Sequence, residues 1–234
     1  MRGRGNLGRF IESSSAIAHK TPSTRTAGRT RPVRGLIFPA ERPEEGLAVI
    51  LIRHETASDI GARERLLDTC FGESRYAKTS QRLREGRLPA DGLSFTAEDA
   101  DGHLVGTVRL WHVATGCGRP ALLLGPLAVD PSIQGCGLGS GLIQAALGRA
   151  EALGHGAVLL VGDAPYYARF GFSGEKTASL YMPGPFERER FLGLELKTGA
   201  LSGARGVLRG TGAFEPIPVH AGEIVAADAR RQAA

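Results

Sequence analysis

The stretch LLLGPLAVDPSIQGCGLGSGLIQAALGRAEAL, residues Leu122 to Leu153, decides the fold of this chain. It begins as an apolar run typical of a buried strand, passes through a turn and a glycine-rich loop, and continues as an amphipathic helix. A glycine-rich loop that leads into a helix N-terminus attracts anions, because unpaired backbone N–H groups and the positive end of the helix dipole converge there. The stretch therefore predicts an anion-binding site at this loop.

The spacing of the glycines distinguishes the loop Gln134–Gly139 from two common nucleotide-binding loops. The fingerprint G-x-G-x-x-G would place its last glycine at Ser140 or at Leu142. A Walker A loop needs a lysine before its Ser or Thr, and this loop has none. A tight turn between strand and helix, without a ligand, is the alternative that the glycines alone leave open.

The strand before the loop is interrupted by Gly125-Pro126. Proline inside a strand belongs at a bulge or an edge, because it cannot donate a hydrogen bond to the ladder. A bulge also bends the strand away from its neighbour. We therefore expect a splayed, bulged strand directly before the glycine loop.

The helix after the loop, from about Gly137 to Leu153, carries an apolar stripe at three- and four-residue spacing. The stripe consists of Leu138, Leu142, Ala146, Ala150 and Leu153, with Ile143 and Leu147 beside it. We expect this stripe to pack on the sheet and to form part of the core rather than a site.

Together with the later segment Tyr166-Tyr167-Ala168-Arg169-Phe170-Gly171-Phe172, these features resemble the GNAT superfamily of acetyltransferases. The loop is similar to the family's Q/R-x-x-G-x-G/A motif, and Val129 to Gly139 fits the register V-x-P-x-x-Q-G-x-G-x-G. Tyr167 falls on the tyrosine of the family's Y-x-x-x-G-F signature. The segment Gly162–Phe172 also looks like a subgroup of uncharacterised bacterial acetyltransferases.

The resemblance covers residues 48–172, and more loosely continues to about 214. It implies acetyl-CoA as co-substrate. The pyrophosphate would be held by the loop residues Gln134, Gly135, Cys136, Gly137, Leu138, Gly139 and Ser140. The backbone of Leu127, Ala128 and Val129 would contact the thioester carbonyl and the pantetheine arm. Tyr167 would protonate the departing thiolate, whereas for Tyr166 we expect a packing role.

The order of expected elements indicates a mixed α/β (α+β) fold rather than a doubly wound one. The resemblance implies the GNAT acyl-CoA N-acyltransferase fold, with a mostly antiparallel sheet and flanking helices. The expected strands are 47–53, 93–97, 104–111, 122–129, 157–161, 191–196 and 206–209, with a hairpin turn at 99–102. Helices are expected after Asp59 as a cap, at 76–87, at 137–153 and at 165–170.

Three regions follow from composition and the resemblance. Residues 1–46 are expected to form a disordered basic tail, 47–172 the catalytic core, and 173–234 the strands that complete the sheet and the acceptor site before a flexible tail. The net charge of +5 comes from residues 1–45, which hold nine Lys/Arg and four Asp/Glu, leaving 20 of each elsewhere. The basic charge therefore does not indicate a nucleic-acid groove in the core.

Three widely spaced cysteines, Cys70, Cys117 and Cys136, match neither a zinc pattern nor a disulfide framework. We expect a reducing cytoplasm, no bound metal and no membrane segment. Although Cys136 lies in the loop, a covalent acyl-enzyme is not expected, because the amides beside it would face phosphates.

The general base is not fixed by the sequence, because the strand Leu122–Val129 contains no acid. Four residues are candidates: Glu98, Asp99, His112 and Asp163. Asp163 is nearest to Tyr167 in sequence, but an Asp before Ala-Pro often caps a turn.

The sequence thus predicts an N-acetyltransferase that transfers the acetyl group of acetyl-CoA to a primary amine by direct attack in a ternary complex. The acceptor pocket would be built from 71–76 and 181–186. The acceptor, the acyl chain length and the choice between monomer and homodimer are left open. An acyl-CoA-binding sensor or interaction module without catalysis is the alternative, and nucleic-acid binding through the tail is a further one.

Overall fold

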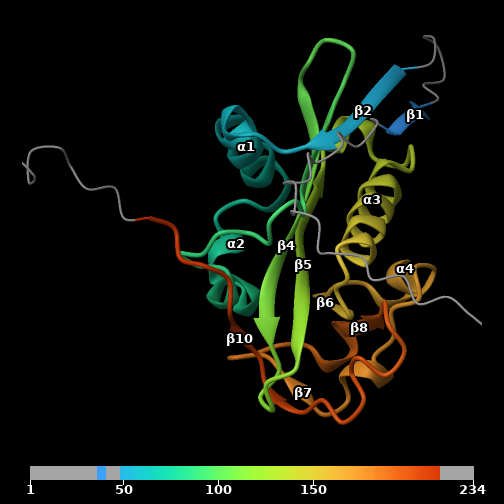
Figure 1. Ribbon diagram of the computed structural model, residues 1–234. Coiled ribbons are helices and arrows are strands. Elements are labelled where there is room, and N and C mark those ends of the chain that lie inside the picture. Colours follow the sequence, from blue (N-terminus) through green and yellow to red (C-terminus); the bar gives the residue numbers. More distant parts are fainter. Residues whose placement is uncertain (1–35, 41–47, 217–234) are drawn as a thin grey trace, which may run out of the picture. The chain divides into compact units, whose positions relative to one another are not determined.

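The computed structural model describes residues 36–40 and 48–216 of the chain (Figure 1). In this part, an eight-stranded sheet has the order β1-β2-β3-β4-β5-β6-β8, with β10 added to β4. Its strands are β1 (Leu36–Ala40), β2 (Ala48–His54), β3 (Ser94–Glu98), β4 (Leu104–Ala114), β5 (Pro120–Val129), β6 (Ala157–Val161), β8 (Phe191–Glu195) and β10 (Arg209–Gly210). All pairs are antiparallel except β5 and β6, which are parallel. A separate parallel pair joins β7 (Leu180–Tyr181) to β9 (Gly206–Val207).

Helices cover both faces of the sheet (Figure 1). They are α1 (Ile60–Phe71), α2 (Ser74–Ala77), α3 (Leu138–Ala152) and α4 (Ala164–Ala168). Short 3-10 helices span Ala57–Asp59, Thr79–Leu83, Pro131–Ile133, Glu175–Thr177 and Arg188–Arg190. In Figure 1, α1 and α2 lie on one side of β4 and β5, and α3 lies on the other. This arrangement confirms the expected mostly antiparallel mixed sheet with flanking helices.

Side chains along β5 alternate between the two faces of the sheet, and the extra residue at the Gly125-Pro126 bulge shifts this alternation by one position. Leu122 and Leu124 are buried in one cluster with the stripe of α3, including Leu142. Ala128 is buried against Leu66 on α1. The expected stripe of α3 is thus confirmed as core at Leu138, Leu142, Ala146 and Ala150, whereas Leu153, just past the end of the helix, is exposed. The buried part of the stripe orients the N-terminus of the helix toward the end of β5.

A bulge in β5 is confirmed at Gly125-Pro126. The register with β4 shifts there, so that Leu124 pairs with Leu110 while Leu127 pairs with Val108. On the other edge, β5 pairs with β6 at only two positions, Leu122 and Leu123. Beyond Leu123 the two parallel strands separate, which leaves an open strand edge from the bulge to Val129.

The expected helix over 76–87 is wrong. The chain instead forms α2, an extended residue at Lys78 (φ −65°, ψ 135°) and the 3-10 helix Thr79–Leu83. Thr79 and Ser80 favour non-helical backbone because their hydroxyls compete for backbone hydrogen bonds. The break places Lys78 and Arg84 beside the splayed strands.

Three further expectations need correction. β1 lies within 1–46, the segment expected to be disordered, and its apolar run Leu36-Ile37-Phe38 has the high strand propensity that β-branched and aromatic residues give. The rest of that tail, and 217–234, lie outside the described residues.

Asp59 does not cap α1. Its carboxylate accepts from the N–H of Thr56 (2.7 Å), the residue that begins the preceding 3-10 helix. The strand expected at 206–209 is divided between β9 and β10, which belong to different sheets. None of the described helices is both long and apolar enough to cross a bilayer.

Candidate active site

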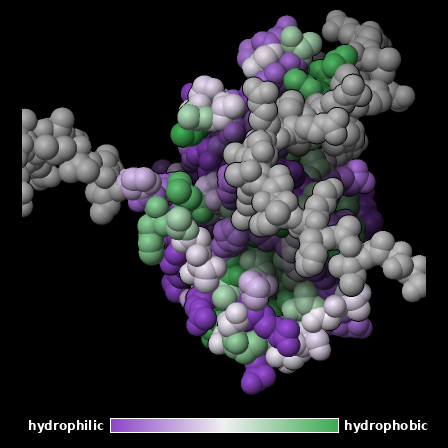
Figure 2. All heavy atoms as spheres, in the orientation of Figure 1, coloured by the Kyte–Doolittle hydropathy of each residue, from purple (hydrophilic) through white to green (hydrophobic). Residues whose placement is uncertain are grey.

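A cavity of about 340 Å³, here called the central cavity, opens where β5 and β6 separate. Its walls come from β5, from the end of β6, from α4 and from the segment after α1. It is lined by Phe71, Arg75, Lys78, Ser80, Gln81, Arg84, Leu123, Leu124, Gly125, Pro126, Leu127, Val161, Gly162, Asp163, Tyr167 and Arg190. On the face seen in Figure 2, the coloured hydrophobic residues lie in small groups among hydrophilic ones.

Tyr167 lies in the wall of this cavity. α4 begins after Asp163, whose carboxylate accepts from the N–H of Tyr166 (3.1 Å) and so caps the helix. The ring of Tyr167 rests on Gly162, where an added Cβ would stand 2.2 Å from its Cε2 atom. Burial raises the pKa of Tyr167 to about 12, and the charge of Arg190 acts in the opposite direction. The phenol is therefore protonated at neutral pH and available as a donor.

The bulge in β5 fixes the wall of the central cavity opposite Tyr167. The indole Nε1 of Trp111 on β4 donates to the carbonyl of Gly125 (2.6 Å). The N–H of Asp130 is bonded to Val105 on β4 (2.9 Å). Because successive N–H groups along a strand alternate in direction, those of Leu127 and Val129 point to the open edge. These donors face the gap into which an extended ligand could insert.

The glycine loop borders a second hollow of about 500 Å³, here called the loop hollow. It is lined by Leu127, Val129, Ile133, Gln134, Gly135, Gly137, Leu138, Gly139, Ser140, Tyr166 and Arg169. The first hydrogen bond of α3 runs from Gly141 to Gly137 (3.0 Å), so the N–H groups of Leu138, Gly139 and Ser140 have no partner within the helix. Leu127 borders both this hollow and the central cavity, so the two spaces meet at the bulged strand.

Left-handed backbone at Gly135 (φ 91°) and Gly137 (φ 83°) shapes the loop. A Cβ at either position would meet nothing within 4 Å, so the space in front of the loop is open. Side chains there would suffer backbone strain and would project into the hollow.

Two of the ten predicted cofactor-binding residues do not line the hollow. Ala128 is buried against α1, and the thiol of Cys136 donates to the carbonyl of Ile133 (3.0 Å). Gln134 borders the hollow but also donates to the carbonyl of Val129 (3.2 Å), which ties the loop to the end of β5. Ala128 and Cys136 can therefore contact a ligand only through their backbone.

Arg169 was not assigned a role from the sequence. Its guanidinium donates to the hydroxyl of Ser140 (3.0 Å) and lies over the ring of Tyr166 (4.1 Å). It is thus a fixed cation beside the unpaired N–H groups of α3. The signal was present as the arginine two residues after Tyr167, but only the tertiary structure brings it to the loop.

The four candidate bases are dispersed. Glu98 pairs with Arg53 (2.7 Å), and Asp99 accepts from the backbone of His103 (2.8 Å) in the β3–β4 turn. His112 faces His155, with ring centroids 5.6 Å apart, and lies outside the central cavity. Asp163 is the one carboxylate among the described residues that line this cavity.

The cavity also gathers cations that the sequence analysis did not predict as site residues. Arg84, Lys78, Arg75 and Arg190 all line it. Burial, followed by the charges of Arg84 and Arg190, lowers the pKa of Lys78. Lys78 and Arg84 come from the segment 76–87 that was wrongly expected to be one helix. Arg75 lies in the segment 71–76 expected at the acceptor pocket, and Arg190 ends the 3-10 helix before β8.

A third cavity of about 420 Å³, the side cavity, adjoins the central one and shares Lys78, Ser80, Val161 and Arg190 with it. Met182, Pro185 and Phe186 form another part of its wall. The two segments expected to build an acceptor pocket, 71–76 and 181–186, thus line adjoining spaces.

Comparison with known sequences relates this chain to a protein family. Residues 62–172 match the model of the Acetyltransferase (GNAT) family. The uncharacterized N-acetyltransferase YhbS of Escherichia coli strain K12 is 31% identical over 160 residues, covering 68% of this chain and 95% of that protein. The uncharacterized N-acetyltransferase YjhQ of the same strain is 35% identical over 140 residues, covering 57% and 75% respectively.

Comparison with solved structures leads to the same family. The crystal structure of YhbS from Escherichia coli in complex with CoA superposes with a TM-score of 0.61 at 30% identity, covering 73% of this chain and 94% of that one. A GNAT family acetyltransferase from Brucella melitensis, in complex with acetyl-CoA, shares the fold with a TM-score of 0.50 at 24% identity, covering 71% and 96%. From the bulged and splayed strands, the glycine loop at the start of α3 and these relatives, it follows that the chain belongs to the GNAT family and is an acyltransferase of the N-acetyltransferase type.

Proposed function

We propose that the protein transfers the acetyl group of acetyl-CoA to a primary amine by direct attack within a ternary complex. The observation that carries this proposal is the meeting of the loop hollow and the central cavity at Leu127. A cofactor anchored at the loop would run along the open edge of β5 and end beside Tyr167. In support, the solved structures of two relatives contain CoA and acetyl-CoA.

Acetyl-CoA binding would use the chain's own donors. The pyrophosphate would meet the N–H groups from Gly135 to Ser140 and the guanidinium of Arg169, since helix N-termini and arginine both favour phosphate. The outward N–H groups of Leu127 and Val129 would bind the pantetheine arm. Near the bulge, such a donor would also polarise the thioester carbonyl as negative charge develops on its oxygen.

The acceptor amine would enter the central cavity and attack the carbonyl carbon. As the C–N bond forms and the C–S bond breaks, CoA leaves as a thiolate, to which Tyr167 would give its proton. A phenol with a pKa near 12 needs water to reprotonate it or cations to stabilise the phenolate, and Arg190 lines the same cavity. The proton lost by the amine would pass to Asp163 or to water. We also propose a cytoplasmic location, which the free thiols of the three cysteines support.

Calorimetric titration with acetyl-CoA tests the binding step. We expect wild type to bind with micromolar affinity and Gly137→Glu to lose binding, because its carboxylate would stand where the phosphates bind. The matched control is Gly199→Glu, at an exposed glycine of similar left-handed backbone (φ 79°) with nothing within 4 Å of an added Cβ. It imposes the same kind of strain and should leave binding intact.

A free-thiol assay with a panel of amines then separates the alternatives. Release of CoA that depends on an amine supports the transferase. Binding of acetyl-CoA without turnover on any amine would identify the sensor alternative instead. If folded wild type binds neither acetyl-CoA nor longer acyl-CoAs, the proposed function is wrong.

A further inference from the structure

Arg84 is a buried cation with no partner in the described part of the chain. Its residue is only 9% exposed, and its Nε atom has no hydrogen-bond partner there. One of its terminal nitrogens lies 3.9 Å from the position of a Cβ on Gly125, which places the guanidinium beside the bulge. Burial, with the charges of Arg75 and Arg109, lowers the pKa of Arg84 to about 10.

Two of the neighbouring cations are already neutralised. Arg75 pairs with Glu64 (2.6 Å) and Asp68 (2.9 Å), while Arg109 pairs with Glu55. Arg84 and Lys78 form no ion pair with any described carboxylate. Because a buried charge without a partner is costly, an anion that binds on this side of the cavity would be stabilised by Arg84.

The guanidinium of Arg84 lies inside the proposed acceptor site. Arg84, Gly125 and Tyr167 line one cavity, whose volume of about 340 Å³ suits a small molecule. The anion site at the start of α3 is a different place, lined by the glycine loop and Arg169. An anion at Arg84 would thus belong to the acceptor and not to the pyrophosphate.

We propose that the acceptor is a small amine that carries a carboxylate or phosphate group, and that Arg84 binds this group with help from Lys78. The inference rests on the proposed function and specifies its substrate class. The planar guanidinium can donate two parallel hydrogen bonds to either anion, which would orient the amine toward the thioester. The bound anion completes the charge balance of the cavity.

The same cations would assist the chemistry. Attack requires a neutral amine, and positive charges nearby disfavour the ammonium form, as they do for Lys78. The cations would therefore attract the anionic group of the acceptor and favour loss of the proton from its ammonium group. This explains how a cavity whose described wall contains a single carboxylate, Asp163, can serve amine acylation.

Arg84→Met tests the inference, because methionine keeps an unbranched chain of similar reach without the charge. We measure initial rates with two matched pairs of acceptors: L-alanine against L-alaninamide, and O-phosphoethanolamine against ethanolamine. Wild type should prefer one or both anionic members, and the pair that shows the preference identifies carboxylate or phosphate. In Arg84→Met, kcat/KM for the preferred anionic acceptor should fall by about 10- to 100-fold, as expected for loss of a hydrogen-bonded ion pair, and the preference should disappear.

The matched control is Arg87→Met. Arg87 lies three residues away, donates to the carbonyl of Gly212 (2.6 Å) and stacks on Phe214 (4.1 Å), outside the cavity. Its loss should lower the thermal midpoint and leave acceptor preference unchanged. Arg84→Met should instead keep or raise the midpoint without ligand, because it removes an uncompensated buried charge.

A readout without turnover separates the inference from the proposed function. The thermal midpoints of wild type and Arg84→Met are measured with added acetate and with inorganic phosphate. If no amine is acetylated but an anion stabilises wild type and not Arg84→Met, the proposed function fails and the anion site stands. If wild type shows neither anion preference nor anion stabilisation, or if Arg84→Met retains both, the inference is overturned.

Discussion

At the scale of single residues, the contact between Gly162 and Tyr167 controls the reacting end of the site. Only a residue without a side chain allows the ring to lie against the end of β6, since a Cβ would stand 2.2 Å from Cε2. The backbone of Gly162 is held by a hydrogen bond to Arg190 (2.8 Å) and has ordinary φ, so alanine would meet a steric conflict and no backbone strain.

Gly162→Ala should therefore displace Tyr167 and lower kcat by roughly 10²-fold or more, the usual contribution of a positioned proton donor. The KM for acetyl-CoA should change little, because the glycine loop is untouched. Gly148→Ala, at an exposed position on α3 with nothing within 4 Å of the added Cβ, is the control and should leave kcat unchanged. A full kcat in Gly162→Ala would remove Tyr167 from the proposed mechanism.

At the scale of elements, the carboxylate of Asp59 links the 3-10 helix that precedes α1 to β2. Asp59 accepts from both terminal nitrogens of Arg53 (2.8 and 2.9 Å) and from the N–H of Thr56. The hydrogen bond from Arg53 is the largest cause that holds the pKa of Asp59 well below its ordinary value. Since the folded pKa is lowered, the stabilisation is full above the unfolded pKa of about 3.9 and is lost as the pH falls toward the folded value.

Asp59→Asn should thus lower the free energy of unfolding by about 1–3 kcal/mol at neutral pH, as expected for a buried charged hydrogen bond. The difference from wild type should shrink as the pH falls below about 4, because the wild-type carboxylate is then protonated in the unfolded chain. Urea unfolding at neutral pH and at pH near 3 measures both. Asp68→Asn removes a more exposed partner of Arg75 and should cost no more than about 1 kcal/mol at either pH. A difference that does not depend on pH would contradict this account.

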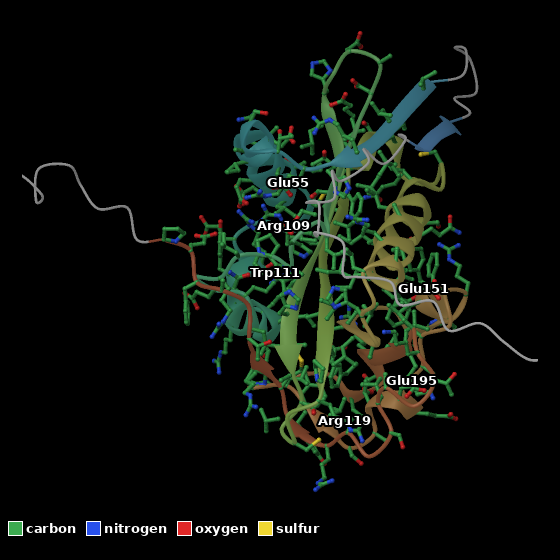
Figure 3. The ribbon with its side chains drawn as sticks, viewed as in Figure 1. Glu55, Arg109, Trp111, Arg119, Glu151 and Glu195 are labelled. Carbon is green, nitrogen blue, oxygen red and sulfur yellow. The ribbon has the colours of Figure 1, made fainter. Side chains whose placement is uncertain are left out.

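At the scale of the molecule, a chain of ion pairs runs from the cavity to the centre of the sheet. Glu64 joins Arg75 to Arg63, and Glu55 joins Arg63 to Arg109. Figure 3 shows Glu55, Arg109 and Trp111 following one another along the face that carries α1 and α2. The Glu55 side chain is 5% exposed, so it compensates two arginines from α1 and β4 away from water.

Glu55→Gln should destabilise the protein by about 3–5 kcal/mol, because it leaves Arg109 buried without a charged partner and Arg63 with Glu64 alone. Chemical denaturation gives the value. Lys176→Met, which removes the half-exposed partner of Glu195, is the contrasting variant and should cost about 1 kcal/mol or less. If the two variants lose similar stability, the buried network does not hold α1 to the sheet as described.

The local sequence pattern was sufficient to predict structural features that depend on residues close together in the chain. The stripe of α3, the hairpin turn at 99–102 and the bulge at Gly125-Pro126 were all predicted from spacing, glycine and proline. The segment 76–87 failed because its helix-forming residues are overruled by tertiary contacts, such as Arg82 donating to the carbonyl of Pro183 (3.0 Å). The cap at Asp59 failed because Arg53, on another element, binds its carboxylate.

The sequence by itself determined the fold and the family, since a bulged strand, a glycine loop, an amphipathic helix and a later tyrosine motif occur in one continuous region. It could not determine how the acceptor site is built. Arg84 and Lys78, Gly125, and Tyr167 come from three separate segments, and only the separation of β5 from β6 makes them walls of one cavity. The same holds for Arg84 being without a partner, because burial and the pairing of its neighbours are properties of packing in space. Backbone periodicity is local and can be read along the chain, whereas the charge balance of a cavity is decided by residues that only folding brings together.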